Sequence, residues 1–385
     1  MTGRVTAARA LGRILRGGAW SNVLLGGATD DGARVVAALA MDALRTHGLA
    51  DAVLADASGR PLDRIQDDVR DVLRIAVGEL DRARLAPEII TSAAVDATRA
   101  MGHDRATGFV NGVLRTVVRS GLPDLPAAAR FGVPGWLDRR LREAWGADEA
   151  DRFWVASAEP ARVGLFGDGV PGDALTAVPE VPGAWLADRP EPDLQVIDPA
   201  SAAVALAVGA GEGDLVLDAA AAPGGKTAIL AAAVGESGLV VAADRHRRRT
   251  TTAARRLPDA RWVRADGRHP PFEPASFDRV LLDAPCTGLG TLRRRPEILR
   301  RIEESEAARL AALQSELLER ALEQVRPGGR VVFSVCTVLA EETIAHVAGG
   351  WRPPSIGPGR QWGNGHLMGP HLGPTDGMFI SVLDG

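Results

Sequence analysis

The chain has 385 residues, of which 46% are hydrophobic and 24% are charged, and its net charge at pH 7 is −4. This length favours two or three domains over a single core, and the slightly acidic balance excludes a uniformly basic nucleic-acid coat protein. Its 2 cysteines cannot form a disulfide framework; with no apolar run of about 18 residues and no signal-peptide pattern, we expect a cytoplasmic protein without a membrane span.

Residues 4 to about 120 are predicted to be helical throughout. Segments such as "RVTAARALGRILRG" and "IQDDVRDVLRIAVGELDRA" place apolar side chains every three or four residues, which is the period of one helix face. Glycine, proline and aspartate interrupt this pattern in "SGRPLD" and "GHDRAT". We therefore expect a compact all-α domain over residues 1–122.

Residues 123–195 are the least regular part of the sequence. "GLPDLPAAARFGVPGW" is a joint rich in proline and glycine, and "VPGWLDRRLREAWGADEADRFWVASA" continues as a helix pair. From 161 to 195 the chain is rich in Pro, Gly and Asp and has few apolar runs, which is compatible with a small subdomain or with a linker. We describe the whole stretch as a helical linker with a reduced pre-catalytic segment.

From residue 196 to 385 short apolar runs alternate with helical patterns. "DLVLDAA", "GLVVAAD", "ARWVRAD", "FDRVLLDAP" and "GRVVFSVCT" are predicted strands, and "TDGMFISVLDG" is a plausible final one. Helical segments such as "ESEAARLAALQSELLERALEQV" lie between them. This alternation predicts a doubly wound α/β domain with a mostly parallel sheet.

Polar and small residues follow these strands at the edge where such sheets bind ligands. In "DAAAAPGGKT", Gly224 and Gly225 let the backbone approach a ligand and expose the amides of a helix N-terminus. The segment is not a phosphate-binding Walker loop, because Ala220 stands where that motif needs glycine. Asp244 and Asp266 end the next two strands and suit ribose hydroxyls and an adenine amino group.

The two cysteines also follow predicted strands. Cys286 lies in "DAPCTGLG", just after Asp283, and Cys336 lies fifty residues further on in "FSVCTV". Free cysteines are often small apolar fillers of a core. They can also be nucleophiles where the surroundings favour the thiolate. The residues by themselves leave both interpretations open.

Four motifs, in this order, resemble those of the Nop/Sun family of RNA cytosine-5 methyltransferases: "DAAAAPGGKT", "DAPCTGLGTLRRRPE", "RPGGRVVFSVCTVLAEE" and "TDGMF". The N-terminal "GFVNGVLR" and its helices resemble the NusB-like domain fused to bacterial members, which methylate 16S ribosomal RNA. The resemblance implies a multidomain protein. An all-α NusB-like RNA-binding domain would precede a Rossmann-like class I methyltransferase domain with a mostly parallel seven-stranded sheet.

The resemblance also implies the chemistry and the partners. Cytosine C5 is a weak nucleophile until a thiolate adds to C6, after which C5 can attack the methyl group of S-adenosylmethionine. Attack is assigned to Cys336, release of the product to Cys286, and contact with the base to Asp283. We expect S-adenosylmethionine as the cofactor and RNA, above all 16S ribosomal RNA, as the partner, with no metal, no membrane and a monomeric state.

The family motifs further imply a cofactor site. Asp244 would hold the ribose, Asp266 the adenine, and Asp283 would lie beside the methyl donor. The methionine end would be surrounded by one loop, whose residues are Ala220, Ala221, Ala222, Pro223, Gly224, Gly225 and Lys226. Lys226 would meet the methionine carboxylate or cap the turn, and we favour the former. Arginines at 245–249 and 293–295 are expected to contact the RNA backbone.

Two other functions stay open. A DNA cytosine-5 methyltransferase would attack with Cys286 and would need no second thiol in "FSVCTV". A non-catalytic RNA-binding or ribosome assembly factor would keep the fold without binding the cofactor. The sequence also departs from the family at Val335, which removes a hydroxyl beside Cys336 and raises the question of altered rate or geometry there.

Overall fold

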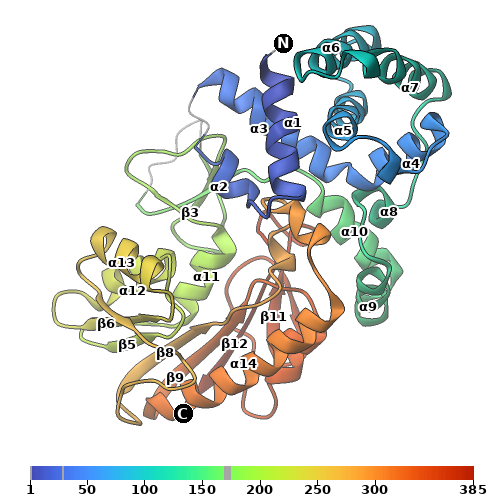
Figure 1. Cartoon of the computed structure of the whole chain (residues 1–385). Helices are drawn as coiled ribbons and strands as arrows, with labels where there is room; N and C mark the ends of the chain where they lie inside the picture. Colours follow the sequence, from blue (N-terminus) through green and yellow to red (C-terminus); the bar gives the residue numbers. More distant parts are fainter. Residues whose placement is uncertain (1, 28–29, 169–174) are drawn as a thin grey trace. The chain divides into compact units, whose positions relative to one another are not determined.

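The computed structural model describes residues 2–27, 30–168 and 175–385, and the chain divides into two compact units (Figure 1). The first unit comprises Met1–Pro160 together with Leu292–Arg301, and the second comprises Ala161–Thr291 with Ile302–Gly385. The chain therefore leaves the second unit at residue 292, contributes ten residues to the first, and returns.

The first unit is all helical, as expected for the N-terminal region. Its α-helices are α1 (Thr2–Leu15), α2 (Ser21–Leu25), α3 (Asp31–Arg45), α4 (His47–Ser58), α5 (Asp67–Arg82), α6 (Pro87–Ala100), α7 (Thr107–Ser120), α8 (Ala127–Phe131), α9 (Gly135–Trp145) and α10 (Ala147–Ser157). The 3-10 helices are η1 (Leu62–Arg64), η2 (Asp104–Ala106) and, from the second half of the chain, η4 (Pro296–Arg300). Apolar side chains at helical spacing form one core, with Leu11, Leu73 and Leu114 fully buried.

The segment Leu292–Arg301 is bonded into this helical unit. The buried carboxylate of Glu297 accepts hydrogen bonds from the amide and the hydroxyl of Ser21, at 2.8 and 2.9 Å. The Arg301 guanidinium donates to the carbonyls of Ile14 and Ala19 at 2.7 and 2.5 Å. These contacts join residues almost three hundred positions apart, so no local sequence pattern predicts them.

The second unit begins with a small antiparallel sheet. Its strands are ordered β2-β3-β1-β4 and are β1 (Val163–Phe166), β2 (Thr176–Ala177), β3 (Ala184–Ala187) and β4 (Gln195–Val196). The described part of 161–195 thus forms a small subdomain, one of the two alternatives that the sequence left open. Helix α11 (Pro199–Ala207) follows, with Asp198 as its N-cap: the carboxylate accepts from the amide of Ala200 at 2.9 Å.

The main sheet has eight strands in the order β10-β11-β12-β9-β8-β5-β6-β7. The strands from β7 to β9 pair in parallel, whereas β12, β11 and β10 pair antiparallel. Their bounds are β5 (Leu215–Asp218), β6 (Leu239–Asp244), β7 (Arg261–Arg264), β8 (Phe277–Asp283), β9 (Val325–Val335), β10 (Arg360–Trp362), β11 (Gly365–Met368) and β12 (Met378–Asp384).

The sheet has one strand more than the predicted seven. Neither β10 nor β11 was named from the sequence; β10 has three residues at the edge and pairs with β11 across the two-residue turn of Gly363 and Asn364. Gly363 adopts a positive φ of 57°, which a tight hairpin turn requires. The glycine and asparagine in "RQWGNGHLM" are typical of such a turn, but the strands on either side are too short to show an alternation of apolar and polar residues.

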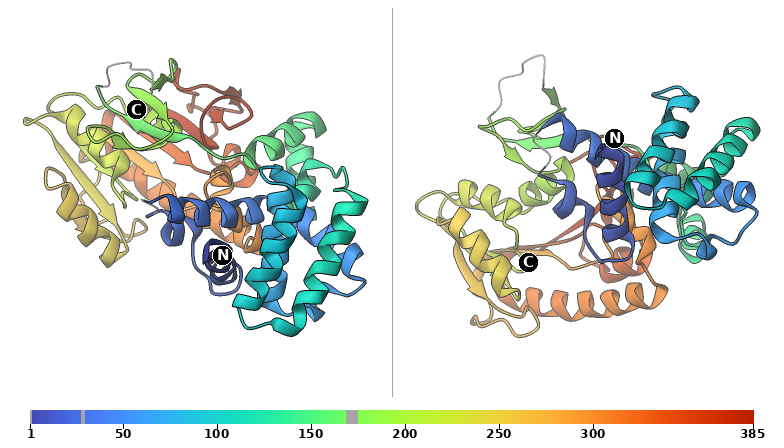
Figure 2. Two further views of the ribbon diagram at one scale, coloured as in Figure 1. Left: turned by 90° about the horizontal axis from the view of Figure 1, so that it is seen from above. Right: turned by 45° about the horizontal axis from the view of Figure 1, so that its top comes forward.

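The helices of the second unit cover both faces of this sheet. Besides α11, they are α12 (Gly225–Val234), α13 (Arg247–Arg256) and α14 (Glu304–Gln324), with short 3-10 helices η3 (Leu289–Thr291), η5 (Ala340–Glu342) and η6 (Ile344–His346). The chain moves from β5 towards one edge and from β8 towards the other, so right-handed crossovers place α14 on the opposite face from α12 and α13. Figure 2 shows the long α14 running along the sheet. The reversal between β5 and β8 is the switch point where such sheets bind ligands.

No helix within the described ranges combines the length and the apolar character that crossing a membrane requires.

Candidate functional site

The carboxyl ends of the five parallel strands bring the predicted site residues together. Asp244 and Asp283 are the last residues of β6 and β8, Asp266 follows β7 by two residues, and Cys336 directly follows β9. Because parallel strands end at the same edge of a sheet, these side chains share one edge. Asp218, the last residue of β5, joins them, although we did not select it from the sequence.

The loop between β5 and α12 is held by the strands on either side. The amide of Ala219 donates to the carbonyl of Leu281 in β8, and the amide of Ala221 donates to Ala243 in β6, both at 2.9 Å. Gly224 has a φ of +104°, and a Cβ atom there would lie 2.7 Å from a methyl group of Leu257. Both the backbone conformation and the space therefore require glycine at this position.

Asp244 is oriented towards this loop. Its Oδ2 accepts from the amide of Ala222 at 3.3 Å, and its Oδ1 accepts from the amide of His246 at 2.7 Å. The side chain of Gln195 covers the loop from the small sheet by donating to the carbonyl of Gly225 at 2.7 Å. The predicted loop residues and the predicted ribose ligand are thus neighbours.

Asp266 has a partner that the sequence analysis did not anticipate. The guanidinium of Arg268 donates to both carboxylate oxygens, at 3.1 and 2.7 Å. This hydrogen bonding, together with the amide of Arg268, lowers the pKa of Asp266 to about 2. The carboxylate therefore stays ionised and is fixed beside the end of β7.

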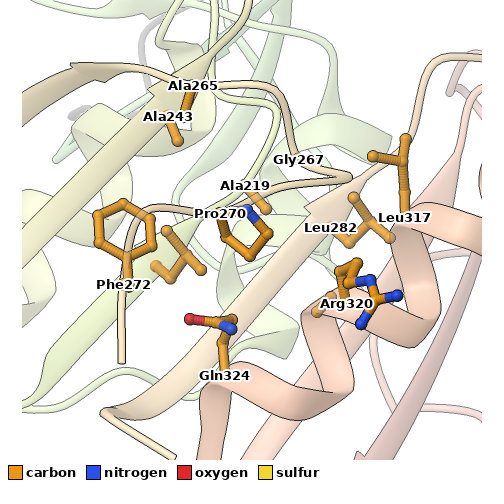
Figure 3. A pocket seen from close by; sticks show the side chains of 12 residues that line it. Ala219, Ala243, Ala265, Gly267, Pro270, Phe272, Leu282, Leu317, Arg320 and Gln324 are labelled. Carbon is orange, nitrogen blue, oxygen red and sulfur yellow. The ribbon is translucent and has the colours of Figure 1, made fainter. Parts of the chain in front are cut away.

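An apolar cavity lies between the sheet and α14, next to the segment that carries Asp266 (Figure 3). Ala219, Ala265 and Gly267 form part of its wall, and the side chains of Phe272 and Leu317 line it further. Its volume of about 20 Å³ holds roughly one water molecule. The cavity is therefore too small for a nucleoside.

Lys226 and Asp283 form an ion pair at the centre of this edge. Nζ of Lys226 lies 2.6 Å from Oδ2 of Asp283, and the hydroxyl of Ser334 donates to Oδ1 at 3.0 Å. Burial lowers the pKa of Lys226, but the charge and hydrogen bond of Asp283 raise it overall, so the ammonium stays charged. In the structure the ammonium of Lys226 is paired with Asp283, and the contact with the methionine carboxylate that we favoured from the sequence stays a prediction.

The two thiols are side by side. The Sγ atoms of Cys286 and Cys336 are 3.3 Å apart, and both residues are half-buried. The hydrogen bond with Cys336, followed by burial, raises the pKa of the Cys286 thiol well above its usual range. In this contact either sulfur can be the hydrogen-bond donor. Lys226 also interacts electrostatically with Cys336, and a nearby cation favours a thiolate.

Val335 does not line this site. It is fully buried, and it lies opposite Phe379 of the antiparallel neighbour β12. Successive side chains of a strand point to opposite faces, so Val335 lies on the other face of β9 from Ser334, which contacts Asp283. The hydroxyl lost at this position is therefore directed away from Asp283.

Sequence reasoning missed the polar groups behind the two thiols. Glu342 is fully buried and bonds to Thr287 and Thr337, the residues that directly follow the two cysteines. A possible signal was the pair of glutamates in "VCTVLAEE", because charge so close to a buried strand needs a partner. Within the described part of the chain, no group of three or more His, Cys, Asp or Glu side chains could hold a metal ion.

Comparisons with known proteins show the family of this chain. The family described as 16S rRNA methyltransferase RsmB/F matches residues 205–351, and the NusB family matches residues 1–119. Ribosomal RNA small subunit methyltransferase B of Xanthomonas campestris pv. campestris is 32% identical over 385 residues, covering 89% of this chain and 86% of that protein. The protein of the same name from Thermus thermophilus is 37% identical over 317 residues, covering 79% and 74%.

Solved structures share the fold. The crystal structure of PH0851 has a TM-score of 0.76 at 22% identity and covers 99% of both chains. The crystal structure of NSun6 from Pyrococcus horikoshii with SFG has a TM-score of 0.55 at 19% identity, covering 65% of this chain and 98% of that one.

Proposed function

The chain belongs to the RsmB/F family of 16S rRNA methyltransferases, and from this premise we propose that it methylates C5 of a cytosine in RNA, with 16S ribosomal RNA as the substrate. It is an enzyme that uses S-adenosylmethionine. The observation that carries the C5 chemistry is the pair of thiols 3.3 Å apart beside the ion pair of Lys226 and Asp283.

The cofactor site is proposed at the edge formed by β5, β6 and β7. S-adenosylmethionine supplies an electrophilic methyl group when bound. The residues fit it: Gly224 is the N-cap of α12, and the amides of a helix N-terminus suit a carboxylate. Asp244 is available to the ribose and Asp266 to the adenine. The loop from Ala220 to Lys226 would surround the methionine end.

Cys336 is proposed to attack C6 of the base. The hydrogen bond between the thiols and burial raise the pKa of its neighbour Cys286, which disfavours Cys286 as the nucleophile. The ammonium of Lys226 favours a negative sulfur at position 336. Addition to C6 makes C5 nucleophilic; after methyl transfer a base takes the C5 proton, the C5–C6 double bond forms again, and the Cys336 sulfur leaves as a thiolate. Cys286 is proposed to assist that release.

Asp283 is proposed to hold the base. Lys226 and Ser334 fix its two oxygens, so the carboxylate cannot rotate freely. A carboxylate accepts hydrogen bonds, which suits the exocyclic amino group of cytosine. The cytosine has to be unpaired or flipped out of a helix to reach the thiol.

An exposed arginine surface is proposed to hold the RNA backbone. It consists of α13 and its flanks, and its members are Arg245, Arg247, Arg248, Arg249, Arg255, Arg256, Arg261 and Arg264. All eight are exposed, and none has a carboxylate partner within the described ranges. The surface begins directly after Asp244, so it adjoins the cofactor edge. Exposed guanidinium groups without carboxylate partners suit phosphates at this density.

The other predicted arginine patch, at 293–295, makes contacts within the first unit. Arg293 donates to the carbonyl of Pro160 at 3.1 Å, and the Arg295 guanidinium lies over the ring of Trp20 at 5.9 Å. Arg293, Arg294 and Arg295 are half-buried within the first unit. We therefore retain only 245–249 and its neighbours for contacts with RNA.

The proposed function is tested by trapping the covalent intermediate with RNA that contains 5-fluorocytosine, which blocks loss of the C5 substituent. We expect the parent protein to form the adduct, Cys336→Ala to form none, and Cys286→Ala to form an adduct that persists even on ordinary RNA. The reverse assignment would support the mechanism of DNA cytosine-5 methyltransferases. Calorimetry without any binding of S-adenosylmethionine would support a non-catalytic assembly factor.

The RNA target is tested in cells. Bisulfite sequencing of 16S ribosomal RNA from cells with and without this protein should reveal a cytosine whose methylation depends on it. Unchanged 16S methylation, with an active purified enzyme, would exclude this RNA as the substrate and leave the chemistry in place.

A further inference from the structure

A fully buried carboxylate lies directly behind the two thiols. Glu342 ends the short helix η5 and has no exposed surface. It is six residues beyond Cys336 and belongs to the same unit as both cysteines. Burying a carboxylate is unfavourable unless each oxygen is hydrogen bonded, and here both oxygens are.

The hydrogen bonds come from the residues that follow the two cysteines. Oε1 accepts from the amide of Thr287 at 3.0 Å, and Oε2 accepts from the hydroxyls of Thr287 and Thr337 at 2.5 and 2.9 Å. The two hydroxyl oxygens are 2.7 Å from each other. One carboxylate group therefore clamps the turn that carries Cys286 to the segment that carries Cys336.

The clamp is supported from α14. The buried Gln314 donates from Nε2 to Oε1 of Glu342 at 3.0 Å and to the carbonyl of Pro285 at 2.9 Å. Its Oε1 lies 3.0 Å from Nε2 of His346. Gln314 thus fixes the carboxylate and the residue before Cys286 at the same time.

From these contacts we propose that Glu342 is a positioning residue, which sets the separation and orientation of Cys336 and Cys286. This role rests on the proposed function, because it matters only if one thiol attacks and the other assists release. Glu342 contacts neither sulfur, and it acts through Thr287 and Thr337. Removing the carboxylate leaves four donors without their acceptor and frees the two segments to separate.

The separation of the thiols can be measured without any methyl transfer. Diamide, a diazenedicarboxamide oxidant, joins two adjacent thiols in a disulfide and takes up both hydrogens to become a hydrazine. The parent protein should form the Cys286–Cys336 disulfide quickly, because its sulfur atoms are 3.3 Å apart. Folded Glu342→Ala should form this disulfide several-fold more slowly. The rate of disulfide formation in Thr337→Val should lie between those of the parent and of Glu342→Ala.

Kinetics give the second measurement. In Glu342→Ala we expect kcat to fall by about 100-fold, since displacing a reacting group by about 1 Å has an effect of that order. Binding of S-adenosylmethionine should be unchanged, because Glu342 does not contact the loop at 220–226. Glu342→Gln keeps an acceptor for the amide of Thr287, so it should recover part of the rate.

Glu316→Ala is the matched control, because it removes the same charge from the exposed face of α14. In this control, the rate of disulfide formation with diamide and kcat should both equal those of the parent. If Glu342→Ala does not fold, Glu342→Gln and Thr337→Val carry the same comparison. Parent-like oxidation and kcat in the folded Glu342 variants would overturn the positioning role. Slow disulfide formation in these variants would uphold the clamp whether or not the parent methylates cytosine. A parent protein that never methylates cytosine would reject the proposed function alone.

Discussion

Lys226 is the only lysine in the chain, and its ammonium is paired with Asp283 in a partly buried setting. Their side chains are 13% and 25% exposed, so the pair is screened by water only in part. The same ammonium interacts with the sulfur of Cys336. A single side chain therefore orders the carboxylate proposed to hold the base and favours the charged form of the thiol proposed to attack it.

We expect Lys226→Met to lower the rate of adduct formation far more than it lowers affinity for S-adenosylmethionine. Leaving Asp283 without its partner should also destabilise the second unit by about 3 kcal/mol, as removal of one member of a buried pair does. Adduct kinetics and calorimetry on the same sample separate the two effects. The double variant Lys226→Met with Asp283→Asn should recover much of the stability. Equal losses in affinity and in rate would instead place Lys226 on the cofactor.

Asp218 makes the stability of the folded protein depend on pH. Burial raises the pKa of Asp218 from 3.8 to about 6, although the hydroxyl of Thr227 donates to it at 2.7 Å. The folded protein therefore holds this proton more tightly than the unfolded chain. The resulting penalty is absent below about pH 4 and is complete above about pH 6. At its largest, two pKa units correspond to about 3 kcal/mol.

Asp218→Asn should remove this penalty while keeping an acceptor for Thr227. The gain in the free energy of unfolding over the parent should grow by about 1 to 2 kcal/mol between about pH 5 and pH 7.5. Denaturant titrations of both proteins at several pH values measure it, and the comparison cancels all other titrating groups. A gain that does not vary with pH would mean that Asp218 is ionised at low pH in the folded protein too.

At the level of elements, the strands that could be predicted are those that build the site. The apolar runs ending in Asp218, Asp244 and Asp283 predicted β5, β6 and β8, because fully buried strands stand out as continuous hydrophobic segments. The rule that parallel strands end at one edge then placed the aspartates and Cys336 together. The contacts of Ser334 with Asp283 and of Glu342 with Thr287 could not be predicted, because each joins residues more than fifty positions apart through side-chain geometry.

If the arginine surface on and around α13 holds phosphates, RNA binding should depend on salt concentration through these residues. Replacing Arg255 and Arg256 with Gln should weaken binding of single-stranded RNA and should reduce the dependence of log Kd on log salt by about 0.7 for each lost phosphate contact. Affinity for S-adenosylmethionine should not change, because these two residues lie at the far end of α13 from Asp244. Filter binding between low and moderate salt measures the slope.

The control for this surface is Arg309→Gln, which removes an exposed arginine of α14 that is paired with Glu306. It should leave both the affinity and the slope as in the parent. A parent-like slope in the Arg255 and Arg256 variant would exclude the surface from RNA binding.

At the scale of the whole molecule, the two units are not consecutive stretches of sequence. The resemblance to Nop/Sun methyltransferases with a NusB-like domain is confirmed, and from the motifs we proposed boundaries at 122 and 195. In the structure, however, Leu292–Arg301 leaves the second unit and packs into the first. Motif reasoning follows the chain in order, so it assigned this segment to the methyltransferase region that surrounds it in the sequence.

The packing of Leu292–Arg301 into the first unit depends most on Glu297. Its carboxylate is fully buried and is bonded to the amide and hydroxyl of Ser21. Glu297→Ala would leave both donors buried without an acceptor, at an expected loss of about 2 to 3 kcal/mol in the stability of the first unit. Hydrogen exchange should show faster opening of α1, α2 and 292–301, while amides of β5 and β8 keep their protection. Glu303→Ala, which removes an exposed carboxylate just beyond the segment that makes no capping hydrogen bond to α14, should leave exchange unchanged. If Glu297→Ala opened the strands of the second unit as readily as the helices, the segment would belong to the folding of the methyltransferase unit despite its contacts.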